Sequence, residues 1–206
     1  MLKLIIVVAI LTLFVVGHTN AENTKPLRAI AVINGPNGVY GNVTFSQNGC
    51  GESVLIEVSV VGLSPGEHGF HVHEKGDLSN GCLSTGGHYN PEKLDHGAPN
   101  DQVRHIGDLG NIRANEQGVA ETKFSDQVIT LAGHWSIVGR AVVIHSGIDD
   151  LGKTNHPDSK KTGNAGGRAG CGVIGIIASN DTGICSGSMG LIVFPIFLLI
   201  LQFLFK

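Results

Sequence analysis

Aromatic and charged residues are scarce in this chain of 206 residues. Aromatic side chains make up 5% of it and charged side chains 15%, and no internal repeat or heptad pattern is visible. The net charge of −3 argues against general nucleic-acid binding. Glycine, by contrast, is abundant, with 30 residues. Few aromatics and much glycine favour many short strands and tight turns over a helical bundle.

The N-terminus carries a short apolar run. Lys3 precedes Leu4–Val16, a largely apolar stretch of 13 residues, and Thr19-Asn20-Ala21 is a plausible cleavage site. This arrangement is typical of a secretory signal peptide, and the run is too short for a comfortable membrane span. We therefore interpret residues 1–21 as a signal peptide and 22–27 as a short segment before the folded domain. An uncleaved membrane anchor is the alternative.

The C-terminus carries a second apolar run, Leu191–Phe205, which follows the small and polar residues 179–190. Small residues, a spacer of roughly 8–12 residues and an apolar tail are the signature of glycolipid (GPI) anchor attachment. We therefore expect an anchor site near Ser179–Asp181 and a hydrophobic GPI signal or membrane anchor at 191–206. A transmembrane tail is less favoured, because a span needs about 20 residues. A soluble form released into the medium stays open as well.

Four cysteines and two glycosylation sequons agree with the secretory route. The cysteines are Cys50, Cys82, Cys171 and Cys185. Four cysteines allow three pairings, and the sequence alone does not choose among them. The sequons begin at Asn42 and Asn180. Together with the two termini, these features predict an extracellular or cell-surface protein that is lipid-anchored or secreted.

Residues 28–178 show the pattern of one all-β domain. Runs with strand character, separated by turn residues, occupy 29–33, 39–46, 53–60, 69–73, 112–114, 118–124, 141–144 and 172–177. Eight or so short strands predict a sandwich or a barrel. Two long segments, 76–107 and 146–168, lack strand character and are rich in glycine, asparagine and aspartate. Loops of this length are uncommon in compact domains and are usually functional.

A His-x-His pair, His71 and His73, lies in one of these extended runs. In a strand, residues i and i+2 point to the same face, so both imidazoles can reach one metal ion. The pair alone is weak evidence, because two surface or core histidines are about as common. Further candidate ligands follow it: His88, His96, His105, Asp108 and His145. Imidazole suits copper and zinc, and the lack of cysteine in the set argues against a zinc finger or an iron–sulfur cluster.

These stretches resemble the copper/zinc superoxide dismutase family. The matching segments are Gly69–Glu74, Gly81–Cys82, Gly86–Pro91, His105–Asn111, Gly139–His145, Asp149–Gly152, Gly163–Arg168 and Cys171–Gly175. They follow one another in the family's order across the whole expected domain. The resemblance implies an eight-stranded antiparallel Greek-key barrel with two long functional loops. It also implies one copper and one zinc ion per subunit.

The resemblance assigns the candidate ligands to two metals. It implies copper at His71, His73, His88 and His145, and zinc at His88, His96, His105 and Asp108. His88 therefore bridges the two ions. Asp149 matches a carboxylate that hydrogen-bonds one histidine of each metal, here His71 and His96, and so holds both rings.

The activity that the resemblance implies is disproportionation of superoxide to dioxygen and hydrogen peroxide. Copper changes oxidation state, zinc stays redox-silent, and His88 leaves the copper and takes a proton in each cycle. Arg168 matches the residue that docks the anion. Lys161 and Thr162 match neighbours that guide it and select its size. The alternatives are a non-enzymatic copper- or zinc-binding barrel, acting as a carrier or structural module, and a dinuclear-zinc hydrolase, for which a bridging carboxylate is missing.

The resemblance also bears on cross-links and assembly. It implies a disulfide between Cys82 and Cys171, which leaves Cys50 and Cys185 available for a second bridge. An anchor site near residue 180 would remove the last of these cysteines, so the two expectations conflict. Lys75 stands where dimeric members commonly carry an apolar interface residue. Because an unpaired buried charge is costly, the usual homodimer is in doubt.

Overall fold

The computed structural model describes residues 26–49 and 51–178. The expected signal peptide, the C-terminal spacer and the hydrophobic tail lie outside these residues, as do Cys50, Cys185 and Asn180. Within the described ranges, no helix is long and apolar enough to cross a bilayer.

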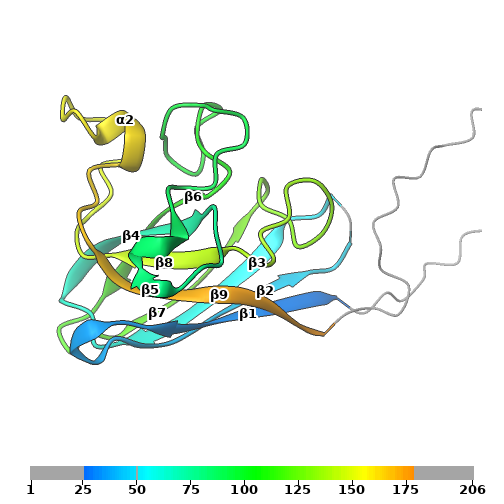
Figure 1. Cartoon of the computed structure of the whole chain (residues 1–206), viewed down its shortest axis with the longest axis horizontal. Helices are drawn as coiled ribbons and strands as arrows, with labels where there is room; N and C mark the ends of the chain where they lie inside the picture. Colours follow the sequence, from blue (N-terminus) through cyan, green and yellow to red (C-terminus); the bar gives the residue numbers. More distant parts are fainter. Residues whose placement is uncertain (1–25, 50, 179–206) are drawn as a thin grey trace, which may run out of the picture.

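Eight antiparallel strands form one sheet that curls into a nearly closed barrel (Figure 1). They are β1 (Leu27–Asn34), β2 (Tyr40–Gln47), β3 (Val54–Val61), β4 (Gly66–His73), β6 (Asp108–Ala114), β7 (Ala120–Asp126), β8 (Ala141–His145) and β9 (Arg168–Ala178). Their order in the sheet is β6-β4-β8-β9-β1-β2-β3-β7. The connections from β3 to β4 and from β7 to β8 cross between the two halves of the sheet, as in a Greek key. The expected all-β, eight-stranded fold is confirmed.

Alternate residues of each strand fill the barrel. In β3, Val54, Ile56, Val58 and Val60 are buried while the residues between them are partly or fully exposed. Phe45 of β2 packs in the same core without any solvent exposure. A fully buried valine, isoleucine or phenylalanine side chain contributes about 1.5–3 kcal/mol of hydrophobic stabilisation. The period-two pattern of apolar residues therefore decides which face of each strand turns inward.

The two long segments contain short elements. The first holds β5 (Ser79–Cys82) and the 3-10 helix η2 (Leu83–Thr85), and the second holds α2 (Ser159–Thr162). Another 3-10 turn, η1 (Pro36–Gly38), joins β1 to β2. Figure 1 shows α2 and the loop before β6 on the same side of the barrel. The two segments that the sequence marks as functional thus lie over the same strands, β4 and β8.

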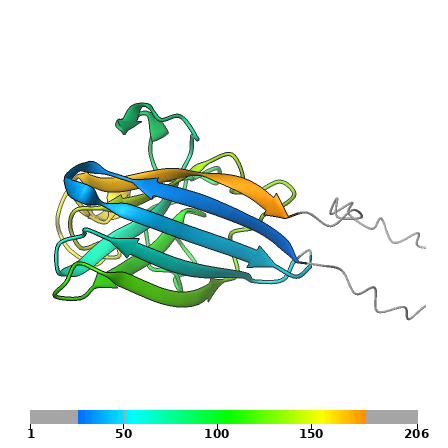
Figure 2. The same cartoon turned by 90° about the horizontal axis from the view of Figure 1, so that it is seen from below.

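The first and last strands of the barrel are neighbours. Arg28 of β1 pairs with Ala178 of β9, so β1 begins where β9 ends (Figure 2). Leu27 pairs with Gln47 at this same end. Asn42, the sequon asparagine within the described residues, lies on β2 with its side chain exposed, as glycosylation would require.

Candidate metal centre

Strand β4 separates the apolar core from the candidate metal ligands. Phe70 and Val72 face the core and are fully buried, whereas His71 and His73 point to the other face. The long loops cover that face, so His71 is 0% and His73 is 1% exposed. Strand β8 pairs with β4 and ends at His145. The two imidazoles of the His-x-His pair thus share one face of a strand, as their spacing predicts.

Four imidazoles converge above these two strands. The group contains His71, His73, His88 and His145, and one ring nitrogen from each lies within 4.8 Å of the chosen nitrogens of the other three. The Nε2 atoms of His73 and His145 are 3.4 Å apart. Among the described residues, Nδ1 of His71 and Nε2 of His88 are buried and lack a hydrogen-bond partner. A buried polar atom needs a partner, and a metal ion at this point would supply one.

A second group shares His88 with the first. It contains His88, His96, His105 and Asp108, all buried. Asp108 Oδ1 lies 2.8 Å from Nδ1 of His88 and 3.1 Å from Nδ1 of His105. Its Oδ2 lies 3.0 Å from Nδ1 of His96. Burial raises the pKa of Asp108, but its three histidine partners outweigh burial and hold it well below the ordinary range. Three imidazoles and one carboxylate form a set that suits tetrahedral zinc.

The carboxylate of Asp149 connects the two groups. Its Oδ2 accepts a hydrogen bond from Nε2 of His71 and its Oδ1 accepts one from Nε2 of His96, both at 2.8 Å. These bonds place the ring protons on Nε2, which leaves both Nδ1 atoms for metal ions. Gly163 is needed beside this carboxylate, because a Cβ there would collide with Asp149 Oδ1.

The electrostatics keep the first group neutral. Burial, together with the nearby His88, lowers the pKa of His71 to about 3 and that of His73 to about 2. Burial also lowers the pKa of His145 to about 4, against a hydrogen bond to the Gly166 carbonyl that raises it. Metal ligation requires neutral imidazole, so these three histidines are ready to bind at neutral pH.

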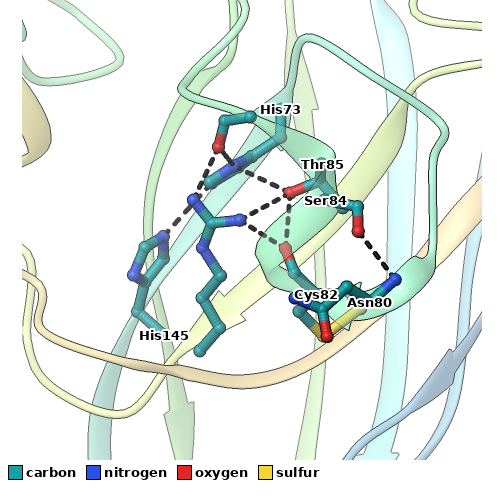
Figure 3. Close-up of a disulfide and its surroundings, with 9 residues drawn as sticks. His73, Asn80, Cys82, Ser84, Thr85 and His145 are labelled. Atoms are coloured by element: carbon teal, nitrogen blue, oxygen red, sulfur yellow. Dashed lines mark hydrogen bonds between the residues drawn. A yellow bond between two sulfur atoms is a disulfide. The ribbon is translucent and has the colours of Figure 1, made fainter.

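Arg168, at the start of β9, is fixed by the loop that carries His88. Its guanidinium donates to the carbonyl oxygen of Cys82, to Thr85 Oγ1 at 2.9 Å and to the Gly86 carbonyl at 2.6 Å. Cys82 and Cys171 form a disulfide across 89 residues (Figure 3), so the expected pairing is present. The arginine is therefore braced on a cross-linked loop, and it stays charged although burial lowers its pKa.

Two expected guidance residues lie apart from the ligands. Lys161 and Thr162 are exposed on α2. Lys161 Nζ lies 3.4 Å from Asp158 Oδ1, and Thr162 Oγ1 donates to the Asp158 carbonyl. Within the described residues, no hydrogen bond joins either of them to a candidate ligand. Lys75 is also exposed, and its nearest acidic partner is the neighbouring Glu74, at 3.8 Å.

Three residues that support the site escape detection by sequence reasoning. Arg104 is buried, donates to the carbonyl oxygens of Pro99 and Asp108, and pairs with buried Asp126 at 2.7 Å. Thr85 places its hydroxyl between His73 and Arg168. A single sequence holds no signal for these roles, because a buried ion pair and two surface charges look the same in it.

Comparisons with known proteins agree with this geometry. A family model for copper/zinc superoxide dismutase matches residues 39–174. The extracellular superoxide dismutase (Cu-Zn) of Drosophila melanogaster is 59% identical over 156 residues, which cover 73% of this chain and 86% of that protein. The crystal structure of the clock protein EA4 aligns with a TM-score of 0.70 and 54% identity, over 78% of this chain and 99% of that one. This chain belongs to the copper/zinc superoxide dismutase family.

Proposed function

We propose that this chain disproportionates superoxide to dioxygen and hydrogen peroxide at a centre in which His88 bridges copper and zinc. One observation carries the proposal. The ring of His88 directs Nδ1 to the group that contains Asp108 and leaves the buried Nε2 without a partner among the described residues. Each nitrogen of a single imidazole thus belongs to a different group, as a bridging ligand requires.

The residues fit the two metals. Copper would be held by His71, His73, His88 and His145, and zinc by His88, His96, His105 and Asp108. Bound there, copper supplies one-electron redox chemistry, while zinc is redox-silent and fixes the bridging ring. The unpartnered nitrogens of the first group and the all-nitrogen donor set favour copper on that side. The carboxylate in the second group favours zinc on the other side.

The protein's own contribution is orientation, attraction and proton handling. Asp149 fixes the rings of His71 and His96. Nε2 of His88 is buried without a partner among the described residues and is the atom that would take up a proton and pass it to the reduced substrate. Arg168 supplies a fixed positive charge for an incoming anion in a chain that is negative overall. Focusing of this kind raises association rates by about 10- to 1,000-fold and weakens with salt.

We propose that Lys161 and Thr162 help to guide the anion to the site, with a smaller effect on the rate than Arg168. Both are exposed on α2, within the long segment that leads to Arg168. The charge of Lys161 is partly offset by Asp158, 3.4 Å away. We therefore expect Lys161→Ala to lower the rate less than a change at Arg168.

The test loads the purified protein with copper and zinc, counts both metals and follows the loss of superoxide. We expect one copper and one zinc per chain and a rate that approaches the diffusional range of about 10⁸–10⁹ M⁻¹s⁻¹. Protein that holds both metals yet leaves superoxide unchanged would contradict the proposal and favour a metal carrier. His88→Gln should abolish the bridge, and zinc and copper contents measured on that variant show whether either site survives alone.

We also propose that the protein is exported and held at the cell surface by a lipid. The apolar termini and the sequons support this location. Phosphatidylinositol-specific phospholipase should release the protein from intact cells. Retention after treatment would favour a membrane-spanning tail, and recovery from the medium without treatment would favour a secreted form.

We propose that Lys75 weakens the homodimer that members of this family commonly form. Exposed Val32 and Val173 form an apolar surface on β1 and β9, and Gly76 approaches Val173 at the edge of this surface. A dimer that covers it would bring the Lys75 charge into the interface. Lys75→Leu should therefore strengthen self-association in sedimentation equilibrium, and an unchanged association constant would contradict the idea.

A further inference from the structure

We propose that the buried hydroxyl of Thr85 is a positioning group for this reaction. One oxygen atom contacts both the ring of His73 and the guanidinium of Arg168, so it sets the copper ligand and the anion-docking group relative to each other. The inference rests on the proposed function and adds to it a residue that neither the ligand set nor the docking role includes.

The hydroxyl of Thr85 has three hydrogen-bond partners around it (Figure 3). Thr85 is 0% exposed and ends the 3-10 helix η2. Its Oγ1 lies 3.1 Å from His73 Nδ1, 2.9 Å from Arg168 Nη1 and 2.9 Å from the carbonyl oxygen of Cys82. A carbonyl only accepts, so the hydroxyl donates its proton to Cys82. Its two lone pairs then accept from the histidine and the arginine, which uses the full capacity of a hydroxyl.

This arrangement selects the tautomer of His73. Its Nδ1 faces two acceptors, the Gly86 carbonyl at 2.9 Å and Thr85 Oγ1, whose own proton is engaged elsewhere. The ring proton therefore lies on Nδ1, and Nε2 is left to face Nε2 of His145. A hydrogen bond to the far nitrogen of a ligating histidine fixes the ring and raises its basicity.

The same oxygen restricts the guanidinium of Arg168. Cys82 and Gly86 hold its two terminal nitrogens through their carbonyls, and Thr85 contributes the side-chain acceptor between them. Among the described residues, the guanidinium makes three hydrogen bonds out of five N–H donors, which leaves two donors for an anion. Their direction depends on the three acceptors. Loss of the hydroxyl should therefore misdirect the anion without changing its charge attraction.

The experiment removes the hydroxyl and keeps the shape. Thr85→Val is isosteric, Thr85→Ser restores the oxygen, and Thr85→Ala removes it with less bulk. The matched control is Ser84→Ala, on the same 3-10 helix, since Ser84 turns toward Asn80 (Figure 3) and accepts from its backbone N–H at 2.7 Å. Each variant is loaded with copper and zinc, and its metal content is measured first.

Three readouts are then compared: azide affinity, the copper(II) electron paramagnetic resonance spectrum and the rate of superoxide loss. We expect Thr85→Val to bind azide about 10- to 150-fold more weakly, the range for one hydrogen bond to a charged group, with an altered spectrum and a lower rate. Thr85→Ser should recover wild-type values for all three, and Ser84→Ala should match the wild type. Thr85→Ala replaces Thr85→Val in the comparison where the latter fails to take up both metals.

Wild-type azide affinity and spectrum in Thr85→Val or Thr85→Ala would overturn the inference. Failure of the proposed function looks different, because the wild-type protein itself would then bind both metals and azide yet consume no superoxide. A loss in Thr85→Val that Thr85→Ser does not rescue would also overturn the inference, because the oxygen atom would not be the cause.

Discussion

Asn111 and Asp149 exchange two hydrogen bonds. Nδ2 of Asn111 donates to the Asp149 carbonyl oxygen at 2.9 Å, and the Asp149 N–H donates to Oδ1 of Asn111 at 2.8 Å. Asn111 belongs to strand β6, whereas Asp149 lies in the loop after β8. A strand side chain thus holds the backbone of the residue whose carboxylate bonds both His71 and His96.

Replacing Asn111 with alanine should weaken zinc binding. Without the amide pair, Asp149 loses its backbone support and holds the His96 ring less firmly. Partners of metal-ligating histidines are typically worth about 10- to 100-fold in metal affinity, and we expect a value near the lower end because the carboxylate itself remains. Competition with a chelator of known zinc affinity measures the change.

The control is Asn115→Ala. Oδ1 of Asn115 accepts hydrogen bonds from the backbone N–H groups of Gln117 and Val119 in the turn between β6 and β7. This variant should lose about 1 kcal/mol of stability and keep its zinc affinity. Equal loss of zinc affinity in both variants would mean that general destabilisation, not Asp149, is responsible.

Arg168→Ala should lower the rate of superoxide loss by about 10-fold or more and flatten its dependence on salt. Copper and zinc contents should stay full, because the guanidinium contacts no ligand atom directly. Arg168→Lys keeps the charge but not the planar fork, so we expect an intermediate rate with the salt dependence preserved. The measurement is the rate over a series of ionic strengths at fixed metal content.

The matched control is Arg113→Ala. Arg113 is exposed on β6, pairs in register with Glu67 and lies five residues along the strand from Asp108. Arg113→Ala removes one positive charge, as Arg168→Ala does, but at a position far from the proposed docking point. If this variant slows the reaction as much as Arg168→Ala does, the effect comes from net charge and the docking role is wrong.

The metal-free protein should be unusually sensitive to acid. Burial lowers the pKa of His71, His73 and His145 to about 3, 2 and 4, from an ordinary 6.5. Between these values the folded chain keeps the three rings neutral, while the unfolded chain protonates them. Their contribution is therefore fully present above pH 6.5 and is lost as the pH falls. Burial lowers the pKa of His88 as well. Between about pH 6 and pH 4.5, the unfolding free energy should therefore fall with a slope equal to about three to four protons.

The pKa shift of His96 has the opposite sign from those of the other four histidines. Burial lowers its pKa, but hydrogen bonds to Asp108 and Asp149 outweigh burial and raise it to about 9. Its stabilising effect is present below pH 6.5 and is lost as the pH rises through 9, so it does not alter the acid slope. Denaturant unfolding at several pH values measures this slope, and a flat profile would refute the prediction.

The double variant Cys82→Ser with Cys171→Ser should lose about 4 to 5 kcal/mol of stability, because the bridge closes a loop of 89 residues. The carbonyl of Cys82 also positions Arg168, so the rate should fall with it. As the control, the variant and the wild-type protein are both reduced, and they should then unfold at the same denaturant concentration. A variant as stable as the oxidised wild type would show that the bridge contributes little.

A second bridge between Cys50 and Cys185 stays a prediction. Intact mass before and after reduction counts the bridges, because each one takes up two hydrogens. Two bridges in the mature protein would support the pairing and place the anchor site after Cys185. One bridge, with a chain that ends near residue 180, would support the earlier anchor site.

Much of the fold is readable from the sequence because it depends on local pattern. The strands follow from alternation and turn residues. The candidate ligands follow from the chemistry of imidazole, and their assignment to two metals rests on the family resemblance. The start of β9 is an instructive exception. The glycine-rich segment before Gly172 resembles a loop, yet β9 begins at Arg168 because Gly170 pairs with Ile144 of β8. Cross-strand pairing overrides the low strand propensity of glycine, and Gly172 itself admits no Cβ against the Val32 carbonyl.

The sequence does not reveal the contacts between polar side chains that the tertiary packing buries. Arg104 and Asp126 form a buried ion pair. From the sequence alone, both side chains would be expected on the surface, because charged residues are mostly exposed to solvent. The role of Thr85 cannot be predicted from the sequence either, since a threonine in a glycine-rich stretch is typical of a turn. Both roles appear once the barrel brings distant segments together.

The order of the strands in the sheet decides which part of the metal centre is first exposed by local unfolding. His71, His73 and His145 lie on β4 and β8, which have a hydrogen-bonded neighbour on each side, whereas Asp108 begins β6, an edge of the sheet. Edge strands and loops open at lower free energy than interior strands, and amide hydrogen exchange reports these openings directly. Thermal fluctuation should therefore release zinc before copper. A chain that has just lost zinc would still hold the proposed copper ligands of β4 and β8 in place.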